Sequence, residues 1–282
     1  MNILVLTILG LIAFAANSIL CRAALGNGLI DAVGFSSIRL ASGAIILVLI
    51  LWIKDPGAFR PKFDPIASLM LATYAFGFSF AYLQLSTGTG ALILFGMVQL
   101  TLIIIGLLKG ERPRPLAWLG MTIAIAGLVY LLLPGVSAPP ISSAILMAIA
   151  GIAWGFYTLR GSRSTNATAN TTWNFVGTLP LVILLILLTG GHMQWNNPDG
   201  VLLAIMSGAL ASGLGYVLWY AALPGLTLTQ AANVQIPVPV IAAFGGILFM
   251  GEHLTLRLII ASLLTLGGIA MVISARQRQI AR

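Results

Sequence analysis

Charge is what this chain has least of. Only 7% of its 282 residues are charged, against about 25% in a soluble domain, while 59% are hydrophobic and the mean hydropathy is +1.05. The single cysteine, Cys21, excludes an intrachain disulfide and a thiolate metal cluster. The two histidines, His192 and His253, lie in or beside predicted loops, and the sequence has no HExxH motif. These shortages exclude a soluble domain and indicate a polytopic membrane protein.

Acidic residues are also scarce, and they are poorly placed for catalysis. All six lie in predicted loops or at the ends of apolar runs. An intramembrane enzyme needs a nucleophile with a base, paired carboxylates or a metal set, and none of these can be assembled here. We therefore expect no enzyme activity, no metal and no cofactor. The net charge of +8 comes from basic residues in short loops, which indicates membrane topology rather than nucleic-acid binding.

Apolar runs long enough to cross a bilayer occur ten times. About 20 apolar residues are needed to span the hydrocarbon core as a helix. The runs begin near residues 3, 32, 65, 89, 115, 141, 170, 200, 228 and 256. The first has neither a basic n-region nor a small-residue cleavage site, so we expect a span rather than a removed signal. The predicted fold is all-α, with ten transmembrane helices in a lipid bilayer.

The distribution of lysine and arginine predicts the orientation of these spans. Eleven of the fourteen lie after even-numbered spans or in the C-terminal tail: Lys54, Arg60, Lys62, Lys109, Arg112, Arg114, Arg160, Arg163, Arg276, Arg278 and Arg282. The positive-inside rule then places the N and C termini in the cytoplasm, as an even number of spans requires. We expect a multi-pass protein of a bacterial-type plasma (inner) membrane.

The chain also repeats itself. The stretch "LLKGERPRPLAWLGMTIAIAGLVYLL" matches "LFMGEHLTLRLIIASLLTLGGIAMVI", with Glu111 and Glu252 each after a glycine and with Gly127 and Gly268 each sixteen residues later. Five spans per copy is an odd number, so the second copy enters the membrane upside down. We predict two inverted five-helix repeats, residues 1–136 and 137–282. Inverted repeats are a recurrent plan of secondary transporters, with the substrate site at the repeat interface.

These features resemble a known family. The stretch "VPVIAAFGGILFMGEHLTLRLIIASLLTLGGIAMVI", with Pro239 thirteen residues before Glu252, and Arg39 in "FSSIRLASGAIIL" are similar to the EamA domains of the drug/metabolite transporter superfamily. The first half departs from the pattern, because Val98 stands thirteen residues before Glu111. Within the superfamily the aromatic-rich spans most resemble the aromatic amino-acid exporters. The resemblance implies a central cavity between the halves, with the fifth and tenth spans at the periphery.

Polar and aromatic residues inside the spans are the candidates for binding. Pro237 and Pro239 would release the carbonyls of Asn233 and Gln235 and expose a broken helical turn to a central path. The alternative is a kink that only shapes the helix. The seven predicted substrate-binding residues are Asn17, Tyr82, Gln99, Trp154, Tyr157, Asn233 and Gln235. For the polar ones among them the competing interpretation is hydrogen bonding between helices.

Three charged residues near span ends are assigned structural roles. Glu111 and Glu252 are expected to cap helices or form ion pairs at opposite faces of the membrane. Arg39 lies about two turns into the second span, where its long side chain can extend outward to the membrane surface, so we assign it a structural role.

The interior predicts the class of solute. A multiply charged phosphate would have too few counter-charges, and a cationic drug would lack a deep carboxylate. A neutral or zwitterionic solute with an apolar body remains. The family resemblance implies that this solute is an amino acid and that the protein exports it. We expect the protein to work as a monomer, by alternating access. Because no carboxylate, lysine or histidine lies at depth, we expect facilitative transport. The alternatives are a drug or metabolite exporter, possibly proton-coupled, and, more remotely, an intramembrane enzyme or a structural subunit.

Overall fold

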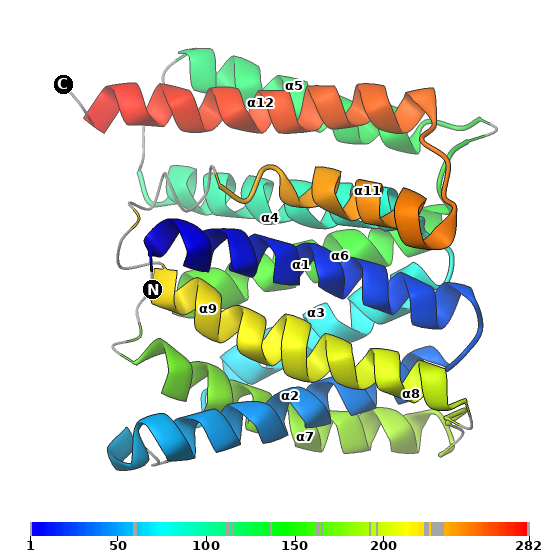
Figure 1. The fold of residues 1–282 in the computed structure, drawn as a ribbon. Coiled ribbons are helices and arrows are strands. Elements are labelled where there is room, and N and C mark those ends of the chain that lie inside the picture. Colours follow the sequence, from blue (N-terminus) through cyan, green and yellow to red (C-terminus); the bar gives the residue numbers. More distant parts are fainter. Residues whose placement is uncertain are drawn as a thin grey trace.

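A computed structural model describes residues 2–58, 61–110, 113, 115–135, 137–161, 164, 166–191, 193–195, 197–222, 226 and 234–280. Every regular element in these ranges is helical, as predicted (Figure 1). The helices are α1 (Ile3–Gly26), α2 (Ala32–Lys54), α3 (Pro65–Tyr82), α4 (Thr87–Leu108), α5 (Pro115–Leu132), α6 (Ile141–Gly161), α7 (Ala167–Leu188), α8 (Pro198–Ile205), α9 (Gly215–Ala222), α11 (Val238–Met250) and α12 (Leu256–Ile280). A π-helical segment, η2 (Met206–Leu214), joins α8 to α9, and a short 3₁₀ turn, η1 (Pro56–Ala58), follows α2.

The helix starts follow from local chemistry. Asn2, Asp31, Asp64 and Asn166 each accept a hydrogen bond from a backbone amide in the first turn of the helix that follows. A side-chain oxygen at this position satisfies one of the amides that the helix leaves without a partner. Pro65 is the first residue of α3, where its missing N–H removes no helical hydrogen bond. These caps explain why the predicted starts near residues 3, 32 and 65 agree with the structure.

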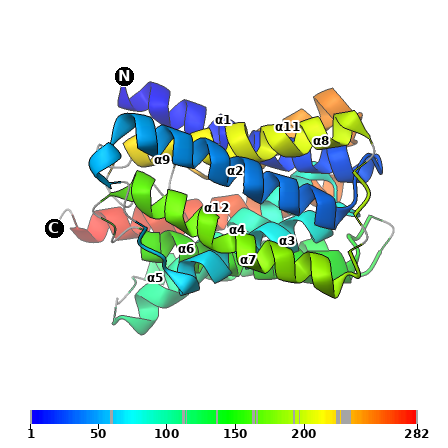
Figure 2. The same cartoon turned by 90° about the horizontal axis from the view of Figure 1, so that it is seen from below.

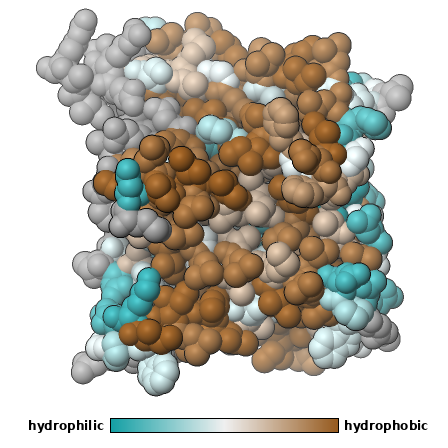
Figure 3. Space-filling view, in the orientation of Figure 1, coloured by the Kyte–Doolittle hydropathy of each residue, from teal (hydrophilic) through white to brown (hydrophobic). Residues whose placement is uncertain are grey.

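The outer surface of the bundle is suited to lipid. Nine of the described helical stretches are long and apolar enough to cross a membrane, with α8, η2 and α9 forming a single stretch, Pro198–Ala222. Figure 3 shows a broad apolar band over the bundle, with hydrophilic residues gathered toward the two edges where the helices end. The chain is therefore a multi-pass membrane protein.

The structure departs from the predicted ninth span in the residues that it describes there. Residues 227–233, including Asn233, lie outside the described residues, and α11 begins only at Val238. Pro237 thus caps α11 and Pro239 lies in its first turn, and neither lies in a helix interior, where prolines would be costly. The carbonyl of Gln235, which we expected to be released, accepts a hydrogen bond from the amide of Val238 at 3.1 Å. That expectation was wrong, because Gln235 belongs to a turn.

The helices form a layered bundle. In Figure 1, α5 and α12 lie together at one side and α2 and α7 at the opposite side, with α1, α3, α4, α6, α9 and α11 between them. Figure 2, seen from below, places α2 and α7 nearest the viewer. The large hydrophobic core joins residues of α1, α2, α3, α4, α6, α7 and α9 with a few from α5, α8, α11 and α12. The middle of the molecule is thus enclosed by helices far apart in the sequence.

The contacts between helices come in matching pairs. Helix α6 packs on α3 and α4, and helix α1 packs on α9 and α11. Likewise α2 contacts η2, while α7 contacts α3. Helices from the beginning and from the later part of the chain therefore both contribute walls to the centre.

Small residues form the interface between α5 and α12. A Cβ atom added to Gly120 would lie 2.6 Å from the carbonyl oxygen of Gly268. One added to Gly268 would lie 2.5 Å from the backbone nitrogen of Ala124. Glycine allows two helix backbones to approach closely enough to gain dispersion energy in a membrane, where the hydrophobic effect does not drive association. The outer pair is a tight, backbone-to-backbone contact.

Candidate functional site

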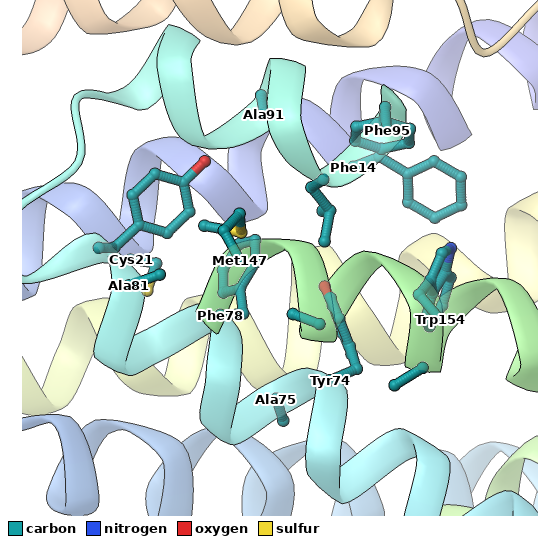
Figure 4. Packing of buried hydrophobic residues seen from close by; sticks show 14 of the residues in the cluster. Phe14, Cys21, Tyr74, Ala75, Phe78, Ala81, Ala91, Phe95, Met147 and Trp154 are labelled. Carbon is teal, nitrogen blue, oxygen red and sulfur yellow. The ribbon is translucent and has the colours of Figure 1, made fainter. Parts of the chain in front are cut away.

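Side chains of α1, α3, α4, α6 and α9 surround a small cavity in the middle of the bundle, which we call the central cavity. Its volume is about 10 Å³, enough for about one water molecule. Figure 4 shows Tyr74 of α3 beside Trp154 of α6, with Phe14 and Phe95 above them in this view. The lining residues are Phe14, Asn17, Tyr74, Phe78, Leu94, Phe95, Trp154 and Tyr216.

Aromatic rings make up most of the cavity wall. The Trp154 ring centroid lies 4.8 Å from that of Tyr74, 5.1 Å from that of Tyr216 and 6.4 Å from that of Phe14. Tilted and edge-on contacts of this kind stabilise ring pairs by about 0.5–1.5 kcal/mol each. Sites for small organic ligands usually enclose about 300 Å³ or more. These rings must therefore separate before the central cavity can hold such a ligand.

A hydrogen-bonded network crosses one side of the cavity. The Asn17 side-chain nitrogen donates to the Tyr74 hydroxyl at 3.0 Å, and an Arg39 terminal nitrogen donates to the same hydroxyl at 2.9 Å. The Ser207 hydroxyl donates to the Asn17 side-chain oxygen. Arg39 Nε donates to the Ser212 hydroxyl at 3.3 Å. Four separate stretches of the chain, α1, α2, α3 and η2, thus meet through polar groups inside an apolar bundle.

Arg39 corrects an expectation drawn from the sequence. Its side chain does not extend to the membrane surface but is only 1% exposed and points into the bundle. The guanidinium carbon lies 5.1 Å from the centre of the Tyr74 ring and 4.9 Å from that of Phe78. The hydroxyl of Tyr74 and the two aromatic faces favour an inward position that sequence position alone did not reveal.

The π-helical segment explains how one helix supplies two members of this network. A π-helix hydrogen-bonds residues five apart, so Ser207 and Ser212 lie on similar sides of η2. In an α-helix a separation of five would turn them well apart. Gly208 allows η2 to lie against α2, because an added Cβ there would collide with the backbone of Arg39. Segments of this kind often occur at functional sites.

The structure brings some of the predicted binding residues to the cavity and leaves others away from it. Asn17 and Trp154 line it. The ring of Tyr157 packs 5.3 Å from that of Trp154, but Tyr157 does not reach the lining. The Tyr82 hydroxyl donates to the Thr87 carbonyl at 3.2 Å, where α3 ends and α4 begins. Tyr82 also packs its ring 4.7 Å from that of Phe78, so Tyr82 and Tyr157 adjoin residues of the cavity wall without lining the cavity.

The polar predictions on the fourth and ninth spans are more distant. Gln99 is buried in α4 but lies outside the cavity lining. Gln235 is half-buried in the turn before α11, and Asn233 lies outside the described residues. We predicted that the ninth span lines the cavity, but none of its described residues does so.

Sequence reasoning did not select several residues that form the site. Phe14, Tyr216 and Arg39 each contact the network or the cavity directly. Arg39 carried a usable signal, because a charged residue eight positions into a span lies about 10 Å along the helix and is by default a functional candidate. Ser207 and Ser212 carried none, because their shared orientation depends on a π-helix that no residue pattern announces.

Polar contacts close each end of the bundle. At one end Glu252 lies 3.4 Å from Arg22 and accepts from the backbone amide of Thr87, the first residue of α4, at 2.9 and 3.0 Å. A carboxylate stabilises the positive N-terminal end of a helix. The expectation that Glu252 caps a helix or forms an ion pair is therefore confirmed. Glu111 lies outside the described residues.

At the other end, Asp64 of the α3 cap pairs with Arg160 of α6. Partial burial raises the pKa of Asp64, but the hydrogen bonds from Arg160 and from the Ala67 amide outweigh it, so the net pKa is lowered. The Arg160 side chain is 47% exposed, whereas that of Arg22 is 24% exposed. The Arg22–Glu252 contact is therefore the more enclosed of the two.

No metal centre is evident in the part of the chain that the structure describes. None of its histidine, cysteine, aspartate and glutamate residues come together in a group of three or more. What the cavity offers chemically is binding: apolar ring faces, a carboxamide and hydroxyls, with the Arg39 guanidinium behind the Tyr74 hydroxyl.

Known transporters and a solved structure resemble this chain in sequence or in fold. The model of the EamA-like transporter family matches residues 141–274. An uncharacterized protein of Pseudomonas aeruginosa is 48% identical over 279 residues, covering 99% of this chain and 97% of that protein. The threonine/homoserine exporter RhtA of Escherichia coli is 27% identical over 236 residues, covering 80% and 77%. A solved crystal structure has the same fold, with a TM-score of 0.67 at 19% identity, covering 96% of this chain and 97% of that one.

Proposed function

The chain belongs to the EamA-like transporter family, whose members are transporters and not enzymes, and we propose that it exports small neutral or zwitterionic solutes. Amino acids, including apolar and aromatic ones, are the proposed class. Residues 1–136 and 137–282 are the two proposed repeats, and the family match at 141–274 lies within the second.

The central cavity is the observation that carries this proposal. Its rings, those of Phe14, Trp154 and Tyr216 among them, offer apolar faces to an apolar side chain. Asn17 and the Tyr74 hydroxyl provide polar groups on one side only. A site with an apolar wall and a polar edge suits a solute with an apolar body and a polar head, as an amino acid has. The named relative RhtA, a threonine/homoserine exporter, supports both the class and the direction.

Alternating access is the proposed mechanism. The matched contacts, in which the first span of each half packs on the third and fourth spans of the other, support two inverted repeats. Rocking one half against the other would separate the rings around the cavity and open one end at a time. The Arg22–Glu252 contact and the Asp64–Arg160 contact lie at opposite ends and would break alternately. With both termini cytoplasmic, the Asp64–Arg160 end faces the cytoplasm.

Facilitative transport by a monomer in a bacterial inner membrane completes the proposal. In the described chain every acidic residue lies at a helix end or in a connection: Asp31, Asp55, Asp64, Asp199 and Glu252. Proton coupling needs a titratable group reachable from both sides, and these positions do not provide one. Export would follow from a high cytoplasmic concentration of the solute.

Reconstitution into proteoliposomes tests the proposal. Purified protein is loaded into vesicles with a panel of radiolabelled amino acids, and their release is followed with and without an imposed proton gradient. We expect release of neutral amino acids at a rate that the gradient does not alter. Uphill, proton-driven movement would contradict the facilitative mechanism, and release of cationic drugs but of no amino acid would replace the proposed class.

A further inference from the structure

Arg39 is an unusual residue for a membrane interior. Its side chain is 1% exposed, and its three nitrogens are only partly satisfied. Nε donates to Ser212 and Nη2 to the Tyr74 hydroxyl, but Nη1 is buried and has no hydrogen-bond partner among the described residues. A buried polar group of this kind is expensive unless something satisfies it.

No carboxylate among the described residues forms an ion pair with Arg39. The carboxylates that form ion pairs in the described chain, Glu252 and Asp64, pair with Arg22 and Arg160 at the two ends of the bundle. Asp31, on the α2 cap, accepts instead from the amides of Gly34 and Gln194. Hydroxyls and ring faces stabilise a guanidinium less than an anion does. A buried guanidinium without a carboxylate partner among the described residues can be satisfied by an anion that a ligand brings.

The geometry around the Tyr74 hydroxyl shows where such an anion fits. This oxygen accepts from Arg39 Nη2 at 2.9 Å and from Asn17 Nδ2 at 3.0 Å, and Tyr74 lines the central cavity. A carboxylate oxygen in its place would accept from the same two donors. The phenol thus occupies the position of an anionic acceptor while the cavity is collapsed.

We propose that Arg39 binds the carboxylate of the transported solute, which replaces the Tyr74 hydroxyl when the cavity opens. This inference rests on the proposed function and names the part of the solute that the site recognises. One guanidinium balances one negative charge, so the site favours a monocarboxylate over a multiply charged phosphate. The ammonium group of an amino acid would lie against the ring faces of Trp154 and Tyr216 across the cavity.

Binding to the detergent-solubilised, full-length protein tests this assignment. The probes are L-phenylalanine and L-threonine, the methyl ester of each, which removes the negative charge, and 3-phenylpropionate, which keeps the carboxylate but lacks the amine. Their dissociation constants are measured by isothermal titration calorimetry. We expect each free acid to bind at least about tenfold more tightly than its ester, the usual scale for a hydrogen bond to a charged group.

Variants of Arg39 sharpen the test. In Arg39→Gln the ratio of ester to acid dissociation constants should fall to about one, and in Arg39→Lys it should recover in part. Arg257→Gln, which removes a guanidinium that donates to the Leu133 carbonyl and takes part in neither ion pair, is the matched control and should keep the wild-type ratio. A merely structural arginine would change the stability of the protein but not this ratio. Should Arg39→Gln fail to fold, the wild-type and Arg39→Lys ratios decide the question.

The outcomes separate this inference from the proposed function. If amino acids are transported but acids and esters bind equally, Arg39 is not the anchor and the proposed function stands. If only 3-phenylpropionate binds, and Arg39→Lys weakens it, the anchor stands and the amino-acid class falls. An acid-to-ester preference that survives in Arg39→Gln, or the absence of binding by all five probes, would overturn the assignment.

Discussion

The α5–α12 pair and the centre of the bundle both contain close helix contacts, but aromatic side chains make up most of the wall at the centre. In the outer pair the backbones touch through Gly120 and Gly268. In the centre Gly151 also lets α6 approach the Leu94 carbonyl of α4. The cavity between these helices is nevertheless walled by rings, with Trp154 in contact with Phe14, Tyr74 and Tyr216. A backbone contact has one good geometry, whereas side chains can change rotamers and separate.

The difference suggests a division of roles. The α5–α12 contact contains no cavity residue and has few ways to rearrange, which suits a fixed support. The aromatic centre has a small cavity and a polar network drawn from four stretches of the chain, which suits a binding site that opens and closes. Changes in the outer pair should therefore alter stability, and changes in the centre should alter transport.

The largest effect is expected from Gly268→Leu. The new side chain would collide with the backbone of α5, starting with a Cβ 2.5 Å from the nitrogen of Ala124. We expect a loss of at least about 1–3 kcal/mol of stability, measured as a lower thermal midpoint in detergent. Gly267→Leu is the matched control, because a Cβ there meets nothing within 4 Å. Equal thermal midpoints of the Gly268→Leu and Gly267→Leu variants would contradict a tight backbone contact between α5 and α12.

A change at the centre should act on transport instead. Trp154→Ala removes the ring that contacts the other walls of the cavity. We expect the transport rate per folded molecule to fall about tenfold, equivalent to about 1.4 kcal/mol, in the proteoliposome assay. Trp118→Ala, on the exposed face of α5, should transport at the wild-type rate. If the two tryptophan variants behave alike, the centre has no special role.

A smaller effect is expected where the two regions are joined. Glu252 lies between α11 and α12 and accepts from the amide of Thr87 at the start of α4. Glu252→Gln keeps an oxygen acceptor but removes the charge that faces Arg22 and the helix end. We expect a loss of about 1 kcal/mol of stability, read as a modest fall in thermal midpoint. A midpoint equal to that of the wild type would show that the centre and the outer pair are not coupled through this residue.

The smallest effect concerns Asp64, far from both regions. Its folded-state pKa is lowered, so its ion pair with Arg160 contributes stability above the unfolded pKa and loses it as the pH falls through the folded value. Thermal midpoints of wild type and Asp64→Asn should differ slightly near neutral pH and converge in acid. A difference that persists or grows in acid would mean that the contribution of Asp64 is not electrostatic.

Much of the fold could be predicted from the sequence because it depends on local signals. The apolar runs set helix lengths, Asp31 and Asp64 cap the starts of α2 and α3, and Pro65 is the first residue of α3. The ninth span was harder, because Pro237 and Pro239 are compatible with either a broken helix or a helix start. The structure has the second arrangement, with α11 beginning at Val238.

The site was less predictable, because its members depend on tertiary contacts. Asn17 and Trp154 were identified as polar or aromatic residues within spans, and both line the cavity. Arg39 was misjudged, since an arginine near a span end can extend outward or inward, and only the packing of α2 against Tyr74 and η2 decides between them. The π-helical segment that orients Ser207 and Ser212 has no sequence signature.

Protection of a cavity residue by solute is the most direct test of the central claim that the solute occupies the aromatic centre. Leu94, which lines the cavity, is replaced by cysteine in a Cys21→Ser background, and its rate of reaction with a membrane-permeant thiol reagent is measured in proteoliposomes. We predict that a transported amino acid slows the reaction in a saturable way, with half-protection near the concentration that half-saturates transport, while a solute that the protein does not transport has no effect. A labelling rate unchanged by saturating amino acid, in vesicles that still transport it, would contradict the account.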